Sequence, residues 1–212
     1  MIKFLCCVPG PHGSEEAPVR IVDAPDGYFI KKDLKTVAEI MTNPANYPKW
    51  THALLKYGGD VVDGTKTDGD SVTFRIAWGA NDPEAKGLAS LVTVTKFEDP
   101  GKLVLELDAY MFDESVPSDE VASVFAGGGD GLHLKDRLIF TENADGTLSH
   151  KRVLLFFDQH PVSLPFILQN WESVYCDDIP HEFDHIKVLV EGGEPPAPAP
   201  AAAPEADAPA AS

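Results

Sequence analysis

The feature that most constrains the fold of this chain is a change in its hydrophobic period. Apolar residues recur at helical spacing before Trp50, alternate with polar residues from there to Asp158, and return to helical spacing beyond Ser163. Strict alternation is typical of strands with one buried face, whereas spacing of three and four residues is typical of amphipathic helices. The sequence therefore predicts an α+β fold in which an antiparallel sheet lies between helical segments.

Six segments after Trp50 show the alternation, and turn-forming residues separate them. These predicted strands are 53–62, 70–79, 88–97, 103–112, 132–141 and 148–158. Tyr28-Phe29-Ile30 predicts one more strand, so the sheet is expected to have about seven strands. Leu103, Leu105 and Leu107 alternate with acidic residues, which predicts one apolar face.

Three helical segments are predicted. Asp33 has the side chain of an N-cap for an amphipathic helix that ends at Asn43-Pro44, and a short second helix or turn ends at Trp50. A long helix is expected over about 163–189, with a kink or a break into two helices at Pro180. A helix about 10 Å in diameter cannot cover seven strands, so the sheet is expected to curl around it and leave an apolar cavity.

The compositional borders predict one domain over 19–193. The first 18 residues are expected to be flexible, and residues 194–212 contain nine alanines and six prolines without any β-branched or aromatic residue. Such a segment lacks the apolar side chains that a core requires, so it is expected to be a disordered tail.

Charge and cysteine content exclude several classes of protein. The net charge is −17, with no concentrated basic segment, which excludes a nucleic-acid binder and disfavours docking to anionic membranes. Three cysteines, Cys6, Cys7 and Cys176, do not form a disulfide framework, so a cytoplasmic location is expected. No stretch approaches the roughly 18 apolar residues of a membrane span. No cofactor is expected, and the protein partner is left unknown.

The segment from Leu34 to Trp50 resembles the START/Bet v 1-like superfamily, which includes polyketide cyclase-like and lipid-transfer proteins. Its Asn43-Pro44-Ala45-Asn46-Tyr47-Pro48-Lys49-Trp50 looks like the family's Asp/Asn-Pro-x-x-Tyr-Pro-x-Trp turn after the first helix. The resemblance covers about 28–190 in its order of elements. It implies a helix-grip fold with a hydrophobic pocket for lipids, sterols or polyketides, but it does not imply catalysis. A long glycine-rich insertion, Phe112 to Gly131, departs from compact members of the family and is expected to act as a lid.

Fourteen residues are predicted to line the cavity, chosen because they lie on the apolar face of a strand or in the aromatic stripe of the last helix. Plain core packing explains any single one of them about equally well. The set is Trp50, Phe74, Ile76, Trp78, Leu105, Leu107, Asp136, Leu138, Phe140, Phe156, Phe166, Asn170, Trp171 and Tyr175.

Asp136 is the polar member of this set with the clearest chemical consequence. Regular alternation places it in phase with Leu134 and Leu138, facing the apolar side, where it would anchor a ligand or act as a general acid. A bulge or a register error would instead place it in solvent, so both interpretations stay open. Arg75, Arg137 and Asn170 are its candidate partners.

His181-Glu182-Phe183-Asp184-His185 matches the His-Glu-x-x-His pattern of zinc hydrolases. The pattern is short and follows Pro180 at the end of the chain, so a solvated helix end is the better interpretation and no metal site is predicted. His160 is interpreted as a turn residue before Pro161, with a place at the mouth of the cavity as the alternative.

Three functions remain open from the sequence. The leading hypothesis is non-catalytic binding or transfer of a small hydrophobic ligand. The second is a cyclase- or aromatase-type enzyme in which Asp136, Tyr175 or His160 acts as acid or base in the same cavity. The third is a protein interaction module that uses the tail or the acidic surface.

Overall fold

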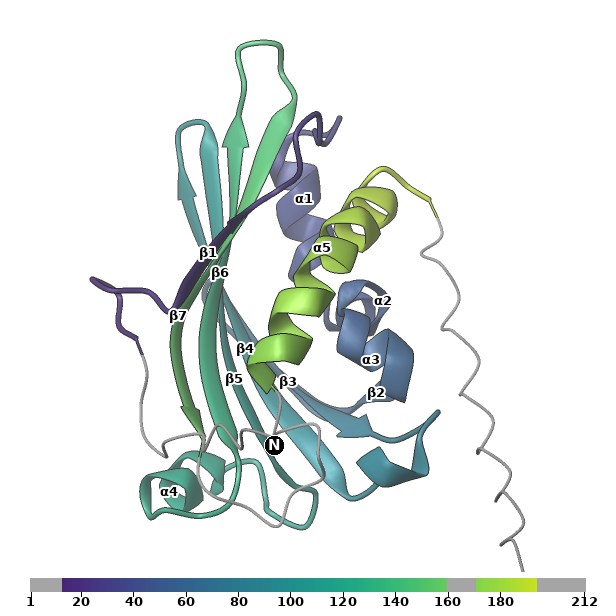
Figure 1. Cartoon of the computed structure of the whole chain (residues 1–212), viewed down its shortest axis with the longest axis vertical. Helices are drawn as coiled ribbons and strands as arrows, with labels where there is room; N and C mark the ends of the chain where they lie inside the picture. The colour runs from purple at the N-terminus through teal and green to yellow at the C-terminus, as the bar shows by residue number, and fades with distance from the viewer. Residues whose placement is uncertain (1–12, 160–170, 194–212) are drawn as a thin grey trace, which may run out of the picture.

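Seven antiparallel strands form one curved sheet in the computed structural model, which describes residues 13–159 and 171–193 (Figure 1). The spatial order is β1-β7-β6-β5-β4-β3-β2. The bounds are Arg20–Asp23 for β1, Gly59–Asp68 for β2, Ser71–Trp78 for β3, Leu88–Asp99 for β4, Lys102–Asp113 for β5, Leu132–Glu142 for β6 and Leu148–Gln159 for β7. From β2 to β7 each strand pairs with the next, so the meander of six that the sequence predicts is confirmed.

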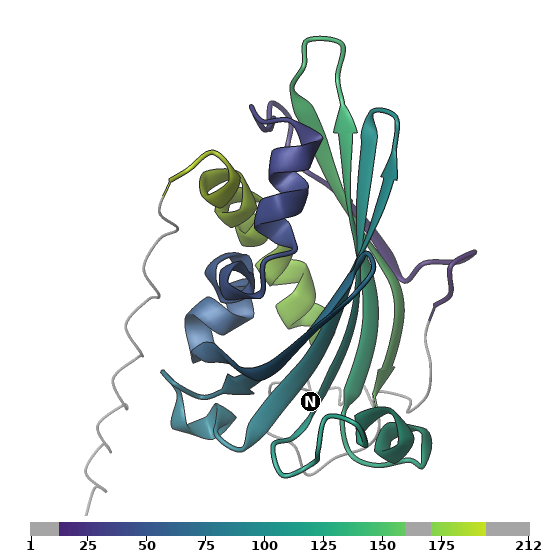
Figure 2. The same ribbon diagram turned by 180° about the vertical axis from the view of Figure 1, so that it is seen from behind.

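Helices cover the concave face of the sheet (Figures 1 and 2). The bounds are Leu34–Met41 for α1, Pro44–Asn46 for the 3-10 turn η1, Tyr47–Trp50 for α2, His52–Tyr57 for α3, Pro83–Ala85 for η2, Val121–Ala126 for α4 and Trp171–Val190 for α5. In Figure 1, α5 runs across the hollow of the sheet beside α1, α2 and α3, whereas α4 lies apart from them. This is the helix-grip architecture that the sequence predicts.

The main core lies between α5 and the inner face of the sheet. Ile179, Phe183, Ile186 and Val190 of α5 are each at most 1% exposed and belong to one cluster with inward-facing strand residues. Each buried aliphatic or aromatic side chain stabilises the fold by about 1.5–3 kcal/mol relative to its exposed state. Helix α1 adds Val37, Ala38 and Met41 to this cluster. Asp33 caps the N-terminus of α1 by accepting a hydrogen bond from the Thr36 amide.

Two predicted strands are wrong. The first half of segment 53–62 is helix α3, because Ala53, Leu54, Leu55 and Lys56 are good helix formers and Gly58 can end a helix with a φ of +78°. Tyr28-Phe29-Ile30 is not a strand either, since Ile30 makes only an isolated bridge to Leu148. The seventh strand is instead β1, which pairs with β7.

A β-bulge in β7 changes which side chains face inward. Lys135 pairs with Phe156 but Asp136 pairs with Leu154, so Leu155 is the extra residue. Such a residue shifts the alternation of the strand by one position. Leu154 and Phe157 therefore pack in the same inner cluster, while Phe156 lies on the outer face.

The insertion between β5 and β6 packs against the outer face of the sheet. Val121 of α4 clusters with Ala89 and Phe112, which point away from the cavity. Arg75 holds the preceding loop by donating hydrogen bonds to the carbonyl oxygens of Glu114 and Val116. The expected lid role is wrong for the described insertion, because it covers the face opposite the cavity.

The C-terminal helix continues through Pro180 without a break into two helices over its described length. Residues 163–170 of the predicted helix lie outside the described residues, as do the predicted tail and most of the predicted N-terminal segment. Among the helices that the structure describes, none has the length and apolarity needed to cross a membrane.

Gly58 joins α3 to β2 and gives a test of this connection. A Cβ at Gly58 would lie 2.4 Å from the Asn81 amide nitrogen, whereas one at Gly27, with the same φ of +78°, would meet nothing within 4 Å. We expect Gly58→Ala to lower the free energy of unfolding by at least about 2 kcal/mol, and Gly27→Ala by about 1 kcal/mol, the cost of the left-handed conformation alone. Urea denaturation of both variants measures this difference; equal losses would contradict the close approach.

Candidate functional site

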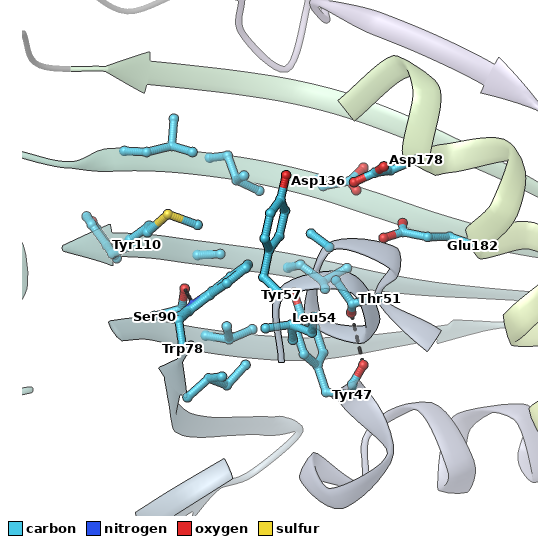
Figure 3. A pocket seen from close by; sticks show the side chains of 18 of the residues that line it. Tyr47, Thr51, Leu54, Tyr57, Trp78, Ser90, Tyr110, Asp136, Asp178 and Glu182 are labelled. Atoms are coloured by element: carbon cyan, nitrogen blue, oxygen red, sulfur yellow. Dashed lines mark hydrogen bonds between the residues drawn. The ribbon is translucent and has the colours of Figure 1, made fainter. Parts of the chain in front are cut away.

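An apolar cavity of about 140 Å³ lies between the inner face of the sheet and helices α2, α3 and α5 (Figure 3). Its apolar wall comes from α3 and from inward-facing positions of β3 to β6. These residues are Ala53, Leu54, Ile76, Trp78, Val92, Leu107, Ala109, Met111, Leu132 and Leu134. The cavity exists at this place because small residues such as Ala53 and Ala109 stand where the other inward positions carry large side chains.

Few polar groups interrupt the apolar wall. The Trp78 indole N–H donates a hydrogen bond to Ser90 Oγ at 2.8 Å, so this side chain is fixed and satisfied. Hydroxyl groups come from Tyr47 and Thr51 at the α2 side and from two further lining residues, Tyr57 and Tyr110. Burial raises the pKa of Tyr47 to about 12, with Arg152 opposing this shift, so Tyr47 is a neutral hydroxyl at physiological pH.

One side of the cavity carries a buried ion triad. Arg152 of β7 donates hydrogen bonds to Asp136 Oδ2 of β6, with an Nε to Oδ2 distance of 3.0 Å, and to Glu182 Oε2 of α5. All three residues are at most 5% exposed and all three line the cavity. The Arg152 guanidinium also lies 5.9 Å from the centre of the Trp50 ring. Removing one member of such a buried triad leaves uncompensated charge in a site of low polarity.

The other oxygen of the Asp136 carboxylate has no hydrogen-bond partner among the described residues. The Asp136 side chain is 1% exposed, so this oxygen is shielded from bulk water. A buried acceptor without a partner costs about 1–3 kcal/mol, and more when it is charged. Asp136 Oδ1 is therefore an unused, buried acceptor on a residue that lines the cavity.

Three histidines of α3 and α5, His52, His181 and His185, lie next to the triad. The His52 ring stacks on His181 at 4.6 Å and on His185 at 5.6 Å between ring centres. Burial lowers the pKa of His52, and the neighbouring histidines lower it further. Burial likewise lowers the pKa of His185, whose Nδ1 lies 3.3 Å from the Trp50 carbonyl oxygen.

The His-Glu-x-x-His pattern does not have the geometry of a zinc hydrolase. Glu182 points into the protein and bonds to Arg152, whereas His181 is exposed. No group of three potential ligands that could hold a metal is present within residues 13–159 and 171–193. The expected solvated helix end is also wrong, because Glu182 and His185 are buried and only His181 and Asp184 of this segment are exposed.

The structure brings four of the predicted cavity residues to the cavity wall: Ile76, Trp78, Leu107 and Asp136. Five others are buried in the main core, where they pack against other side chains. These are Trp50, Phe74, Leu105, Leu138 and Phe140. Their common inward direction was predicted correctly, but the cavity occupies only part of the inner face.

Phe156 is the predicted cavity residue that faces the wrong way. The bulge at Leu155 turns it to the outer face, where its ring contacts His133 at 5.2 Å. Phe166, Asn170 and His160 lie outside the described residues, as do the side chains of Trp171, Tyr175 and Cys176, so their proposed roles stay predictions.

Two of the three candidate partners of Asp136 are wrong, and the third, Asn170, lies outside the described residues. Arg137 points outward to Glu106, and Arg75 binds the insertion loop, so neither reaches Asp136. Arg152 and Glu182 were missed. A signal for Arg152 exists in the sequence, because it lies in phase with Leu148 and Leu154, just as Asp136 lies in phase with Leu134 and Leu138.

Replacing Arg152 tests the triad. We expect Arg152→Met to lower the free energy of unfolding by about 3–5 kcal/mol, because two buried carboxylates lose their shared cation. Arg137→Met is the matched control: Arg137 is 27% exposed and pairs with Glu106 at 2.6 Å on the outer face, so the loss is about 1 kcal/mol or less. Urea denaturation at pH 7 measures both, and equal losses would contradict the buried triad.

His150 predicts how stability depends on pH. Its ring is 3% exposed, stacks on Phe140 at 4.3 Å, and has no partner for either nitrogen among the described residues. Burial, and secondarily Arg152, lower its pKa well below the usual value. Below about pH 6.5 the unfolded chain therefore binds a proton at His150 that the folded protein does not bind. The free energy of unfolding falls by about 1.4 kcal/mol for each unit by which the pH is lowered in this range.

His150→Phe removes this contribution. Between pH 6 and 5 we expect the free energy of unfolding of the variant to fall by about 1.4 kcal/mol less per pH unit than that of the wild type. Above pH 7.5 the difference between the two proteins becomes constant, which provides the internal control. Urea denaturation over pH 5–8 measures both slopes; parallel curves over the whole range would contradict a buried neutral histidine.

Comparisons with known proteins show likeness only at the level of structure. No protein-family model and no curated protein sequence matches the chain. Similar solved structures include human STARD10, with 7% identity, a TM-score of 0.49 and coverage of 81% of this chain and 63% of that one. The lipid transfer and protein localization domain of human StarD13 has 10% identity, a TM-score of 0.46 and coverage of 87% and 91%.

A conserved protein from Geobacillus kaustophilus shows a similar degree of likeness, with 12% identity, a TM-score of 0.46 and coverage of 77% and 91%. This chain thus spans less than two-thirds of the STARD10 structure. The fold itself follows from the chain's own strand order and its C-terminal helix. The chain has the helix-grip fold that its resemblance to the START/Bet v 1-like superfamily implies.

Proposed function

We propose that this protein binds or transfers a small hydrophobic ligand in the cavity between the sheet and α5. The observation that carries the proposal is the apolar wall: ten cavity residues present aliphatic, aromatic or thioether side chains around about 140 Å³. Cavities of this kind, mostly apolar with a few fixed polar groups, are the usual form of small-molecule sites. Ile76, Trp78, Leu107 and Asp136 are the predicted residues that we assign to ligand contact.

The volume limits what fits. An engineered apolar cavity of about 150 Å³ holds one benzene molecule, whereas drug-sized ligands occupy pockets of about 300–1,000 Å³. The described cavity therefore accommodates a single-ring molecule, or one end of a larger lipid, sterol or polyketide-like ligand of the class that the family resemblance implies. A reducing cytoplasm remains the proposed location, on the cysteine pattern of the sequence.

Filling the cavity tests the proposal. We expect benzene, used as a neutral probe, to shift amide signals of residues around the cavity in protein-observed NMR titrations. Ala109 lies in the wall, so Ala109→Phe should occupy the space and weaken benzene binding by about tenfold or more. Ala122→Phe places the same side chain on the exposed face of α4 and should leave benzene binding unchanged.

Native mass spectrometry of the freshly purified full chain, followed by organic extraction, identifies any ligand that it carries from cells. A co-purifying apolar molecule that Ala109→Phe no longer retains would support the proposal. Absence of benzene binding in the wild type, or equal binding by the wild type and Ala109→Phe, would overturn it.

A further inference from the structure

The charged groups of the cavity gather on one side of it. Asp136, Asp178 and Glu182 lie together there, next to α5 and opposite the side where Trp78 and Ser90 stand (Figure 3). Among the described residues that line the cavity, Arg152 is the only lysine or arginine, and it bonds to Asp136 and Glu182. Asp178 Oδ1 lies 3.8 Å from His52 Nε2. This side of the cavity, which we call the acidic end, therefore has an excess of acidic groups.

The hydrogen bonds at the acidic end leave one acceptor unused. Glu182 has both oxygens engaged, Oε2 with Arg152 and Oε1 with the His52 backbone N–H at 2.9 Å. Asp136 accepts from Arg152 through Oδ2 only. Its Oδ1 has no partner among the described residues, although the whole residue is 0% exposed. A donor entering from the cavity is what this oxygen lacks.

We propose that the cavity selects molecules with an apolar, single-ring-sized body and an ammonium group at one end, and that Asp136 Oδ1 accepts the hydrogen bond from this group. The inference rests on the proposed function, since it names the chemical class of ligand for the same cavity. Primary and secondary amines meet this description, whereas fatty acids and other carboxylates do not.

Three alternatives for the polar end of the ligand differ in how they fit the acidic end. A carboxylate brings a fourth negative charge and no donor, so it leaves Oδ1 without a partner and adds repulsion. A hydroxyl donates to Oδ1 but offsets none of the excess charge. An ammonium group does both, and hydrogen bonds between two charged groups are roughly twice as strong as those between neutral groups.

The rest of the cavity fits the apolar body. Trp78 belongs to the wall away from the acidic end, and a volume of about 140 Å³ suits one ring. Arg152 does not compete for the ammonium site, because it lies on the Oδ2 side of Asp136 and its guanidinium is held by Glu182 and placed near the Trp50 ring.

Four one-ring probes that differ only at one carbon test the proposal: toluene, benzyl alcohol, benzylamine and benzoate. Dissociation constants are measured by protein-observed NMR titration of the full-length wild type at pH 7, where benzylamine is protonated. We expect benzylamine to bind about tenfold or more tightly than toluene, benzyl alcohol to lie between them, and benzoate to bind most weakly.

Asp136→Asn and Asp70→Asn form the matched pair of variants. Asp136→Asn keeps the shape of the side chain, and the amide oxygen can accept from Arg152 while the amide N–H₂ faces the cavity, so the preference for benzylamine over toluene should disappear. Asp70 is on the surface, with a side chain 71% exposed, and its replacement should leave the preference unchanged. Asp178→Asn removes a carboxylate from the acidic end while Asp136 and Glu182 remain to bond to Arg152, and it should reduce the preference, which keeps the test decisive if Asp136→Asn does not fold.

The outcomes separate this inference from the proposed function. Equal binding of toluene and benzylamine by the wild type, or tightest binding of benzoate, overturns the ammonium inference and leaves the apolar cavity as a binding site. Retention of the benzylamine preference in Asp136→Asn and Asp178→Asn also overturns it. Absence of binding for all four probes overturns both proposals.

Discussion

The bridge from Arg152 to Asp136 and Glu182 is the interaction on which the arrangement of this protein depends. It joins β6, β7 and α5, and Glu182 extends it to the backbone N–H at the start of α3. Buried ion pairs contribute little net stability, because the loss of hydration nearly offsets the attraction between the charges. Such pairs instead restrict the arrangement of the elements that carry them. Arg152 can bond to Asp136 and Glu182 together only when α5 lies at one position over the sheet, so we interpret the triad as the contact that fixes this helix in place.

The bulge in β7 lets the sheet provide both the triad and the cavity wall. Before the bulge, His150, Arg152 and Leu154 face inward in regular alternation; after it, Phe157 takes the inward position and Phe156 faces out. The bulge lies beside Lys135 and Asp136, where the cavity meets the ions. Bulges bend a strand and increase its local twist, which fits the curved sheet in Figure 1.

The sequence predicted the helix-grip fold because its main determinants are periodic. Alternation in β3 to β7 and the N-cap at Asp33 each report a local preference that the fold obeys. Helix α3 was missed because Ala53, Leu55 and Tyr57 fit the alternation of a strand, whereas Leu54 and Tyr57, which the helix buries, fit helical spacing over the same short segment. The bulge was missed because one extra residue leaves no signal in composition.

The candidate site was harder to predict because it depends on contacts between distant strands. Alternation places Asp136 inward, but only the β6–β7 register shows that its partner is Arg152 and not the adjacent Arg137. Likewise, alternation cannot separate Ile76, which lines the cavity, from Phe74, which fills the core two residues away. The volume of neighbouring side chains decides this, and small residues such as Ala109 mark the open space.

The triad also explains why the unused acceptor is suited to recognition. Arg152 holds Asp136 through Oδ2, so the position of Oδ1 is set before any ligand arrives, and little conformational freedom is lost when a donor meets it. An acceptor on a flexible surface side chain would lose more entropy and would already be hydrated. Because the same guanidinium fixes both α5 and Asp136, the contact that orders the fold also orients the polar group of the proposed binding site.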